Sequence, residues 1–186
     1  MEVSNDTGAV FVTFSQGLYK STDEGLTFTR ILEDNGNAMV FANGVLLMSS
    51  TNDSGTVQVS VDEGESFSSV TVAAGEDIWS MAVTTAVMFM QTLDSDSVAH
   101  LYKSEDQGEN WVAVTIPTLQ DTSAAVYICA DSVDTNNLGL TAGFSGDDNY
   151  ISTNGGSTWT ATGTNSVSGF CTFDAAGRLY MGEQYS

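Results

Sequence analysis

The sequence predicts an all-β fold made of repeated four-stranded antiparallel units, on three observations. Gly occurs 18 times and Pro once among 186 residues, a composition that suits short strands joined by tight turns. An eight-residue pattern, Ser-x-Asp/Asn-x-Gly-x-x-Phe/Trp, occurs four times at intervals of roughly 40 to 50 residues, which indicates a repeat architecture. Each copy follows a short apolar run typical of a strand. We expect a single domain over residues 1–186.

Each octet has the chemistry of a hairpin turn. The short Asp or Asn side chain can accept hydrogen bonds from turn amides, and the Gly two positions later can adopt the positive φ that such a turn needs. The closing aromatic residue leads the return strand and is expected to pack on the sheet. We therefore predict a structural role for four sets of residues: Ser21, Asp23, Gly25 and Phe28; Ser60, Asp62, Gly64 and Phe67; Ser104, Asp106, Gly108 and Trp111; and Ser152, Asn154, Gly156 and Trp159.

These octets resemble the Asp-box, or bacterial neuraminidase repeat (BNR), of a family of β-propellers. The resemblance runs from about Gly17 to about Thr162. It implies a propeller in which each box is the turn between the third and fourth strands of a blade. It also implies that the boxes lie away from any active site.

The segments between the boxes supply the first two strands of each following blade. They are predicted at Ala38–Asn43 and Val45–Ser49, Ile78–Val83 and Ala86–Thr92, Ala124–Ala130 and Leu138–Phe144, and Val167–Phe173 and Arg178–Tyr185. We predict a small β-propeller of four to five blades, with an N-terminal partial blade over 1–30 and a C-terminal partial blade over 165–186. In the simplest closure Val167–Phe173 completes the first blade and closes the ring. A five-bladed ring, an open ring, or a ring completed by another subunit are alternatives.

The charge of the chain excludes two classes of partner. Asp and Glu number 24 against four Lys and Arg residues, a formal net charge of −20. Such a surface is repelled by phosphate backbones and by anionic membrane surfaces, so neither nucleic-acid binding nor membrane insertion is expected. No apolar stretch has the length of a membrane helix, and the N-terminus lacks the pattern of a signal peptide. We expect a location on a virion surface or outside the cell.

The two cysteines give no metal or redox motif. Cys129 and Cys171 lie in apolar runs without CxxC spacing, so buried thiols are the simplest expectation. A disulfide is possible if the two runs form neighbouring inner strands.

Candidate ligand-binding residues lie mainly in the loops that join second to third strands. Asp53, Asp94, Asp96, Asp147 and Asp148 occupy such loops in consecutive blades, where they could form an acidic crescent. Calcium favours oxygen-rich surfaces of this kind, although exposed aspartates in turns need no ligand. Trp79, on a predicted inner strand, is the candidate for stacking on a sugar.

The resemblance includes sialidases, but the sequence argues against an enzyme. Sialidases of this kind hold the substrate carboxylate with three arginines and have about six blades, whereas this chain contains only Arg30 and Arg178. Arg supplies bidentate recognition that other residues do not replace. We predict a non-catalytic structural or interaction propeller with protein partners or symmetry mates, and favour a surface or decoration component of a tailed-phage virion. The alternatives are a lectin-like carbohydrate-binding module and a glycoside hydrolase of sialidase-like fold.

Overall fold

The computed structural model describes residues 1–4, 6–117, 127–141, 148–165 and 170–182. Within them the chain forms antiparallel sheets joined by turns and loops. No helix in this part of the chain is long and apolar enough to cross a membrane.

Four sheets have four strands each, and every one runs in simple sequence order from its first strand to its fourth. The first contains β1 (Glu2–Val3), β2 (Val10–Phe14), β3 (Gly17–Ser21) and β4 (Thr29–Leu32). The second contains β5 (Met39–Ala42), β6 (Val45–Ser49), β7 (Thr56–Ser60) and β8 (Ser68–Thr71). The third contains β9 (Asp77–Val83), β10 (Met88–Leu93), β11 (Ala99–Ser104) and β12 (Val112–Val114). The fourth contains β13 (Tyr127–Ala130), β14 (Leu138–Thr141), β15 (Asp148–Ser152) and β16 (Thr160–Asn165), and a fifth sheet pairs β17 (Cys171–Phe173) with β18 (Leu179–Met181).

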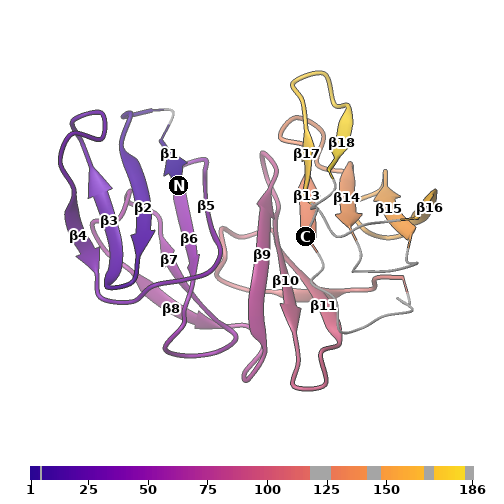
Figure 1. Ribbon diagram of the computed structural model, residues 1–186, viewed down its shortest axis with the longest axis horizontal. Helices are drawn as coiled ribbons and strands as arrows, with labels where there is room; N and C mark the ends of the chain where they lie inside the picture. Colours follow the sequence, from indigo (N-terminus) through magenta and orange to yellow (C-terminus); the bar gives the residue numbers. More distant parts are fainter. Residues whose placement is uncertain (5, 118–126, 142–147, 166–169, 183–186) are drawn as a thin grey trace.

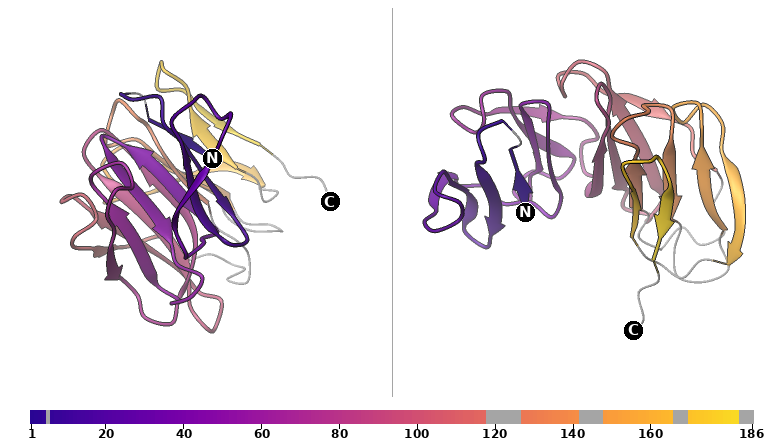
Figure 2. Two further views of the ribbon diagram at one scale, coloured as in Figure 1. Left: turned by 90° about the vertical axis from the view of Figure 1, so that its left-hand side faces the viewer. Right: turned by 90° about the horizontal axis from the view of Figure 1, so that it is seen from above.

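The sheets are arranged as the blades of an open arc. Their first strands lie innermost and contact one another in order, β1 with β5, β5 with β9, β9 with β13 and β13 with β17. Seen from above, the first blade and the fifth sheet lie at the two ends of the arc (Figure 2). Figure 1 shows the strands of the first blade at one side of the molecule and β14, β15 and β16 of the fourth blade at the other. Four full blades and a two-stranded fifth sheet agree with the predicted four to five blades.

The expected ring closure is wrong. The first blade has its own innermost strand because Glu2 and Val3 pair with Phe11 and Val10, so it is a complete four-stranded sheet that ends at Leu32 rather than a partial blade over 1–30. The segment predicted to complete it instead forms β17, which pairs with β18 and packs on β13. The second of the two C-terminal segments contributes β18.

The core consists of one apolar layer between each pair of successive full blades. In the second strand of each blade, successive side chains point to opposite faces of the sheet and so face opposite neighbouring blades. In β6, Leu46 and Met48 pack against the first blade with Phe11 and Leu18, whereas Leu47 packs against the third blade. The same alternation recurs in β10, where Met90 faces the second blade and Phe89 the fourth. Because all five of these β6 and β10 side chains are at most 1% exposed, each interface is a closed hydrophobic layer.

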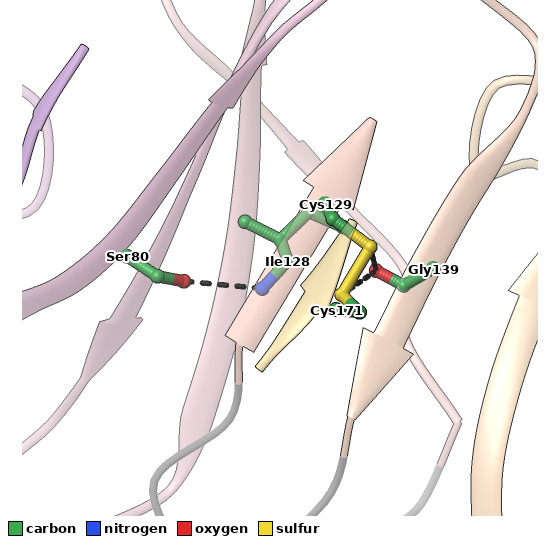
Figure 3. Close-up of a disulfide and its surroundings, with 5 residues drawn as sticks. All are labelled: Ser80, Ile128, Cys129, Gly139 and Cys171. Carbon is green, nitrogen blue, oxygen red and sulfur yellow. Dashed lines mark hydrogen bonds between the residues drawn. A yellow bond between two sulfur atoms is a disulfide. The ribbon is translucent and has the colours of Figure 1, made fainter. Parts of the chain in front are cut away.

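A disulfide joins the fourth blade to the fifth sheet. Cys129 of β13 and Cys171 of β17 are bonded, which settles the alternative that the sequence left open (Figure 3). Gly139 of β14 lies beside the bond, and a Cβ added there would stand 2.7 Å from Cys129 Sγ and 3.0 Å from a methyl carbon of Leu179. Gly139 occupies the position held by Leu47 in β6 and Phe89 in β10, so the missing side chain makes room for the disulfide and for Leu179.

Candidate functional site

Each box turn is closed by a hydrogen-bond network centred on its first and third residues. In the second box the Ser60 hydroxyl donates to Asp62 Oδ1 (2.8 Å) and accepts the Gly64 amide (2.7 Å). Glu63 and Gly64 both have positive φ, 55° and 83°, a conformation that Gly adopts without steric cost. The first, third and fourth boxes repeat these bonds. The box side chains are therefore engaged in the turn itself.

The seventh residue of the box completes the hydrogen-bond network, although the eight-residue pattern leaves this position unspecified. The Ser66 amide donates to Asp62 Oδ1 (2.9 Å) and the Ser66 hydroxyl to Asp62 Oδ2 (2.6 Å). The residues at this position are Thr27, Ser66, Asn110 and Thr158, all with a short polar side chain, and that restriction is the signal that could have identified it. In the fourth box the polarity of the side-chain bond is reversed, because Asn154 Nδ2 donates to the Thr158 hydroxyl (2.8 Å).

These bonds give the box carboxylates a distinct pH response. Hydrogen bonds from the Ser66 side chain and amide hold the pKa of Asp62 at about 2, and the Thr27 side chain and amide do the same for Asp23. Unfolded Asp titrates near 3.9. A carboxyl whose folded pKa is depressed stabilises the fold above its unfolded pKa, and this contribution is lost as the pH falls towards its folded pKa.

The Asp62→Asn variant tests that response, with the natural Asn154 box as evidence that Asn fits the turn. We expect its melting temperature to lie below that of the parent chain above pH 4. The gap should shrink between pH 4 and pH 2, where Asp62 becomes protonated. Thermal unfolding followed by circular dichroism at half-unit pH steps measures it. A gap that stays constant across this range would show that the Asp62 charge plays no part.

The boxes also hold successive blades together. A Cβ added to Gly64 would stand 2.6 Å from Ile31 Cδ1 of the first blade, and one added to Gly108 would stand 3.0 Å from Leu47 of the second. The box aromatic side chains Phe67, Trp111 and Trp159 pack into the interfaces with the preceding blades. The box residues thus contribute to the packing between blades as well as forming the turn.

The acidic candidates lie on the opposite side of the arc, called here the loop face. It consists of the loops between second and third strands (50–55 and 94–98) and the loops between blades (33–38 and 72–76). Asp53 accepts the Thr56 hydroxyl (3.0 Å). Asp94 accepts the amides of Asp96 (2.9 Å) and Val98 (2.8 Å), and the Val98 amide is the main cause that lowers the pKa of Asp94. These two carboxylates therefore interact with residues of their own loops or of the strand that follows.

The remaining acidic candidates give no further support for a metal site. Asp147 lies outside the described residues, and Asp148 begins β15. No group of three or more His, Cys, Asp or Glu side chains in the described parts of the chain is placed to hold a metal ion.

Two carboxylates of the loops between blades connect neighbouring blades at the loop face. Asp34, which is 8% exposed, accepts hydrogen bonds from Asn52 Nδ2 (2.9 Å) and Gln58 Nε2 (3.3 Å) of the next blade. Glu76 likewise accepts the hydroxyls of Thr92 and, at 3.4 Å, Tyr102 in the blade that follows it. Gln58 and Tyr102 both stand two residues before a box serine, so the two contacts are equivalent.

Trp79 is presented to solvent by a β-bulge. On β9, Ile78 pairs with Thr92 and Ser80 pairs with Gln91, which leaves Trp79 as the extra residue between them. A bulge of this kind re-aims a side chain: Ile78 packs towards the second blade, and Ser80 Oγ accepts the Ile128 amide of the fourth (3.2 Å) (Figure 3). Trp79 itself is 44% exposed on an innermost strand. Alternation alone could not have predicted this orientation.

The other two tryptophans have different surroundings. Trp111 Nε1 donates to the Gly108 carbonyl (2.9 Å) and Trp159 Nε1 to the Thr115 carbonyl (3.0 Å). Both rings are partly buried between blades. Trp79 is thus the tryptophan available to a ligand.

A hollow of about 360 Å³ opens on the box side of the arc. It is lined by the turns between first and second strands, with Asp6, Phe41–Gly44, Val83–Thr85 and Ser132. Asn43 Nδ2 donates to the Thr84 (3.3 Å) and Thr85 (2.8 Å) carbonyls across it. The sequence directed attention to the loop face and did not indicate this hollow.

Four equivalent box turns in sheets fanned about one axis define a β-propeller of the BNR/Asp-box repeat type. The family model described as "BNR/Asp-box repeat" matches residues 150–161, which include the whole fourth box. The fold is thus that of a β-propeller, and its four box turns have the Asp-box pattern, as the repeats predicted. No curated protein matches its sequence.

Solved structures share the fold at low sequence identity. The GH74 enzyme of Niastella koreensis is 18% identical with a TM-score of 0.68, over 84% of this chain and 28% of the enzyme. The Hadza microbial sialidase Hz136 is 14% identical with a TM-score of 0.56, over 85% of this chain and 43% of the sialidase. YCF48 bound to D1 peptide is 10% identical with a TM-score of 0.59, over 97% of this chain and 53% of YCF48. The chain thus spans from about a quarter to about half of these proteins, and the likeness shows the fold alone.

Proposed function

We propose that this chain is a non-catalytic interaction propeller that binds a partner on the loop face of its second and third blades. The observation that carries the proposal is the exposure of Trp79. Trp79 is 44% exposed, and a bulge places it outside both blade interfaces. Leaving so large an apolar side chain in solvent costs free energy, which a purely structural role would not require. Large aromatic side chains of this kind dominate the energetics of recognition.

The state of the nearby carboxylates supports a non-catalytic role. Glycoside hydrolysis needs a carboxylic acid whose pKa is raised, opposite a second carboxylate. On the loop face the pKa of Asp94 is instead lowered, and Asp34 and Glu76 are occupied as acceptors between blades. The described carboxyl with a raised pKa is Glu2, which owes the shift to burial and lies on the innermost strand of the first blade.

The structural neighbours include both enzymes and a protein-binding propeller. The enzymes are the GH74 protein and the sialidase, and YCF48 is bound to D1 peptide. A peptide or protein partner therefore has a precedent on this fold, although fold alone does not set function. An extended segment crossing the innermost strands could contact Trp79 directly.

A carbohydrate ligand is the second candidate, and the same residue favours it. The exposed face of an indole ring stacks on the apolar face of a sugar. Polar groups of the loop face, such as the Ser54 hydroxyl that donates to Asp77 (3.2 Å) on the same strand as Trp79, could orient sugar hydroxyls. Glycan and peptide ligands are separated by experiment.

The test probes an immobilised glycan array and an immobilised peptide array with labelled chain, each with calcium and with chelator. We expect specific binding on one array and a loss of at least tenfold in Trp79→Ala. Val133→Ala, which removes a 69% exposed apolar side chain on the box side, is the control and should bind normally. Binding that survives Trp79→Ala, or its absence from both arrays, contradicts the assigned site.

The biological setting that we propose is the surface of a tailed-phage virion. A net charge of −20 keeps copies soluble and repels packaged DNA, and propeller faces suit contacts with symmetry mates. Quantitative mass spectrometry of purified particles tests it. A stoichiometric component should appear at a fixed number of copies per particle, and absence from particles of the source virus removes the virion assignment.

A further inference from the structure

The first blade exposes a face that every other full blade covers with its neighbour. Val10 and Val12 of β2 are equivalent to Leu46 and Met48 of β6, because Val10 and Leu46 each pair with the first serine of a box. Leu46 and Met48 are fully buried against the preceding blade. Val10 and Val12 are only half-buried.

The rest of this face is apolar as well. Cross-strand partners share a face, which places Val3 beside Val10 and Tyr19 beside Val12. The exposed fractions are 46% for Val3, 55% for Phe14, which packs edge-on against Tyr19, and 37% for the box residue Phe28. We call this set, Val3, Val10, Val12, Phe14, Tyr19 and Phe28, the open face.

The chain itself indicates what covers such a face. In each of the three interfaces between full blades, the preceding blade contributes an apolar side chain from the middle of its second strand: Phe11, Leu47 and Phe89, none more than 1% exposed. The occupant of the open face is therefore a propeller blade with a large side chain at this position.

The fifth sheet, at the far end of the arc, carries the matching side chain. Leu179 packs towards Gly139 of the fourth blade, so its neighbour Tyr180 on β18 points the other way. Tyr180 thus occupies the position of Phe11, Leu47 and Phe89, yet it is 51% exposed, and Phe170 beside the same sheet is 66% exposed. The fifth sheet and the first blade lie at opposite ends of the arc (Figure 2).

We propose that two copies of this chain associate head to tail, with the open face of one copy covered by the fifth sheet of the other. The contact is heterologous, since each copy offers two different surfaces. It continues the packing that already joins successive blades within the chain. Because each copy has a formal net charge of −20, repulsion opposes the contact, and added salt should strengthen it by screening.

Sedimentation velocity of the full chain over 1–100 µM tests the proposal. In 0.5 M NaCl we expect the mass to rise from 19.6 kDa to twice that value and beyond with concentration, because a head-to-tail pair keeps one free copy of each surface, with weaker association in 0.02 M NaCl. Phe28→Glu and Tyr180→Glu should each remain monomeric at 100 µM. Val61→Glu, at an apolar residue that is 62% exposed within the second box, is the control and should associate as the parent does.

Mixing the two variants makes the test specific for a head-to-tail contact. Phe28→Glu retains an intact fifth sheet and Tyr180→Glu an intact open face, so an equimolar mixture should form a heterodimer through one good interface. A parent chain that is monomeric throughout overturns the proposal. So does a Tyr180→Glu variant that still dimerises, because the open face would then pair with itself. Unchanged melting temperatures of the variants show that they are folded.

Discussion

Replacing Gly64 by Ala is expected to lower the free energy of unfolding by about 2–4 kcal/mol, one of the largest effects of any single substitution outside the apolar core. Gly64 has φ of 83° and is buried between two blades, where the new Cβ would stand 2.6 Å from Ile31 Cδ1. The cost has two parts: the strain of a left-handed Ala, and the overpacking of the interface between the first and second blades.

Gly25→Ala is the matched control. Gly25 occupies the same position in the first box with φ of 85°, but it is exposed and a Cβ there would meet only Phe28, at 3.9 Å. Gly25→Ala should therefore lower the free energy of unfolding by the conformational part alone, about 1 kcal/mol. Urea unfolding of both variants measures the difference, and equal losses would show that the box glycines act only through their turn.

Removing the disulfide is the second large effect. The bond between Cys129 and Cys171 closes a segment with a sequence separation of 42, and the chain-entropy relation gives a stabilisation of about 4 kcal/mol. In the double variant Cys129→Ser/Cys171→Ser we expect a lower unfolding midpoint and loss of the fifth sheet from the cooperative unit. The two-stranded sheet also packs on β13 and β14, and the disulfide is its covalent attachment to the fourth blade.

Reductant supplies the control for this prediction. Dithiothreitol should lower the unfolding midpoint of the parent chain and leave the double variant unchanged. Hydrogen exchange followed by mass spectrometry should show faster exchange at 170–182 in the reduced parent. A thiol titration that shows full reduction without a change in midpoint would contradict the assigned role.

The repeat chemistry carried most of the fold prediction. The four boxes have the same local hydrogen bonds, so their turns and the strands on either side follow from residues close in sequence. The ring closure does not follow from nearby residues, because whether Glu2–Val3 or β17 joins the first blade depends on contacts between distant segments. Here the Cys129–Cys171 bond and the small Gly139 hold β17 beside the fourth blade.

The candidate site was predicted only in part. The sequence made Trp79 the candidate for stacking on a sugar from its inner-strand position, but the bulge that exposes it depends on the register between β9 and β10. The acidic loops were predicted as a potential cation site. In the structure, Asp94 accepts hydrogen bonds from the amides of Asp96 and Val98. Composition alone cannot separate a free carboxylate from one that closes its own turn.

Turnover on a panel of glycosides, including sialosides and β-glucans, tests the central claim of a non-catalytic interaction propeller most directly. The account predicts that purified chain at micromolar concentration releases no product above the rate in buffer, while the parent and the Trp79→Ala variant remain folded. Product release that scales with protein concentration, persists through repeated purification and is abolished by substitution of a single carboxylate would contradict it.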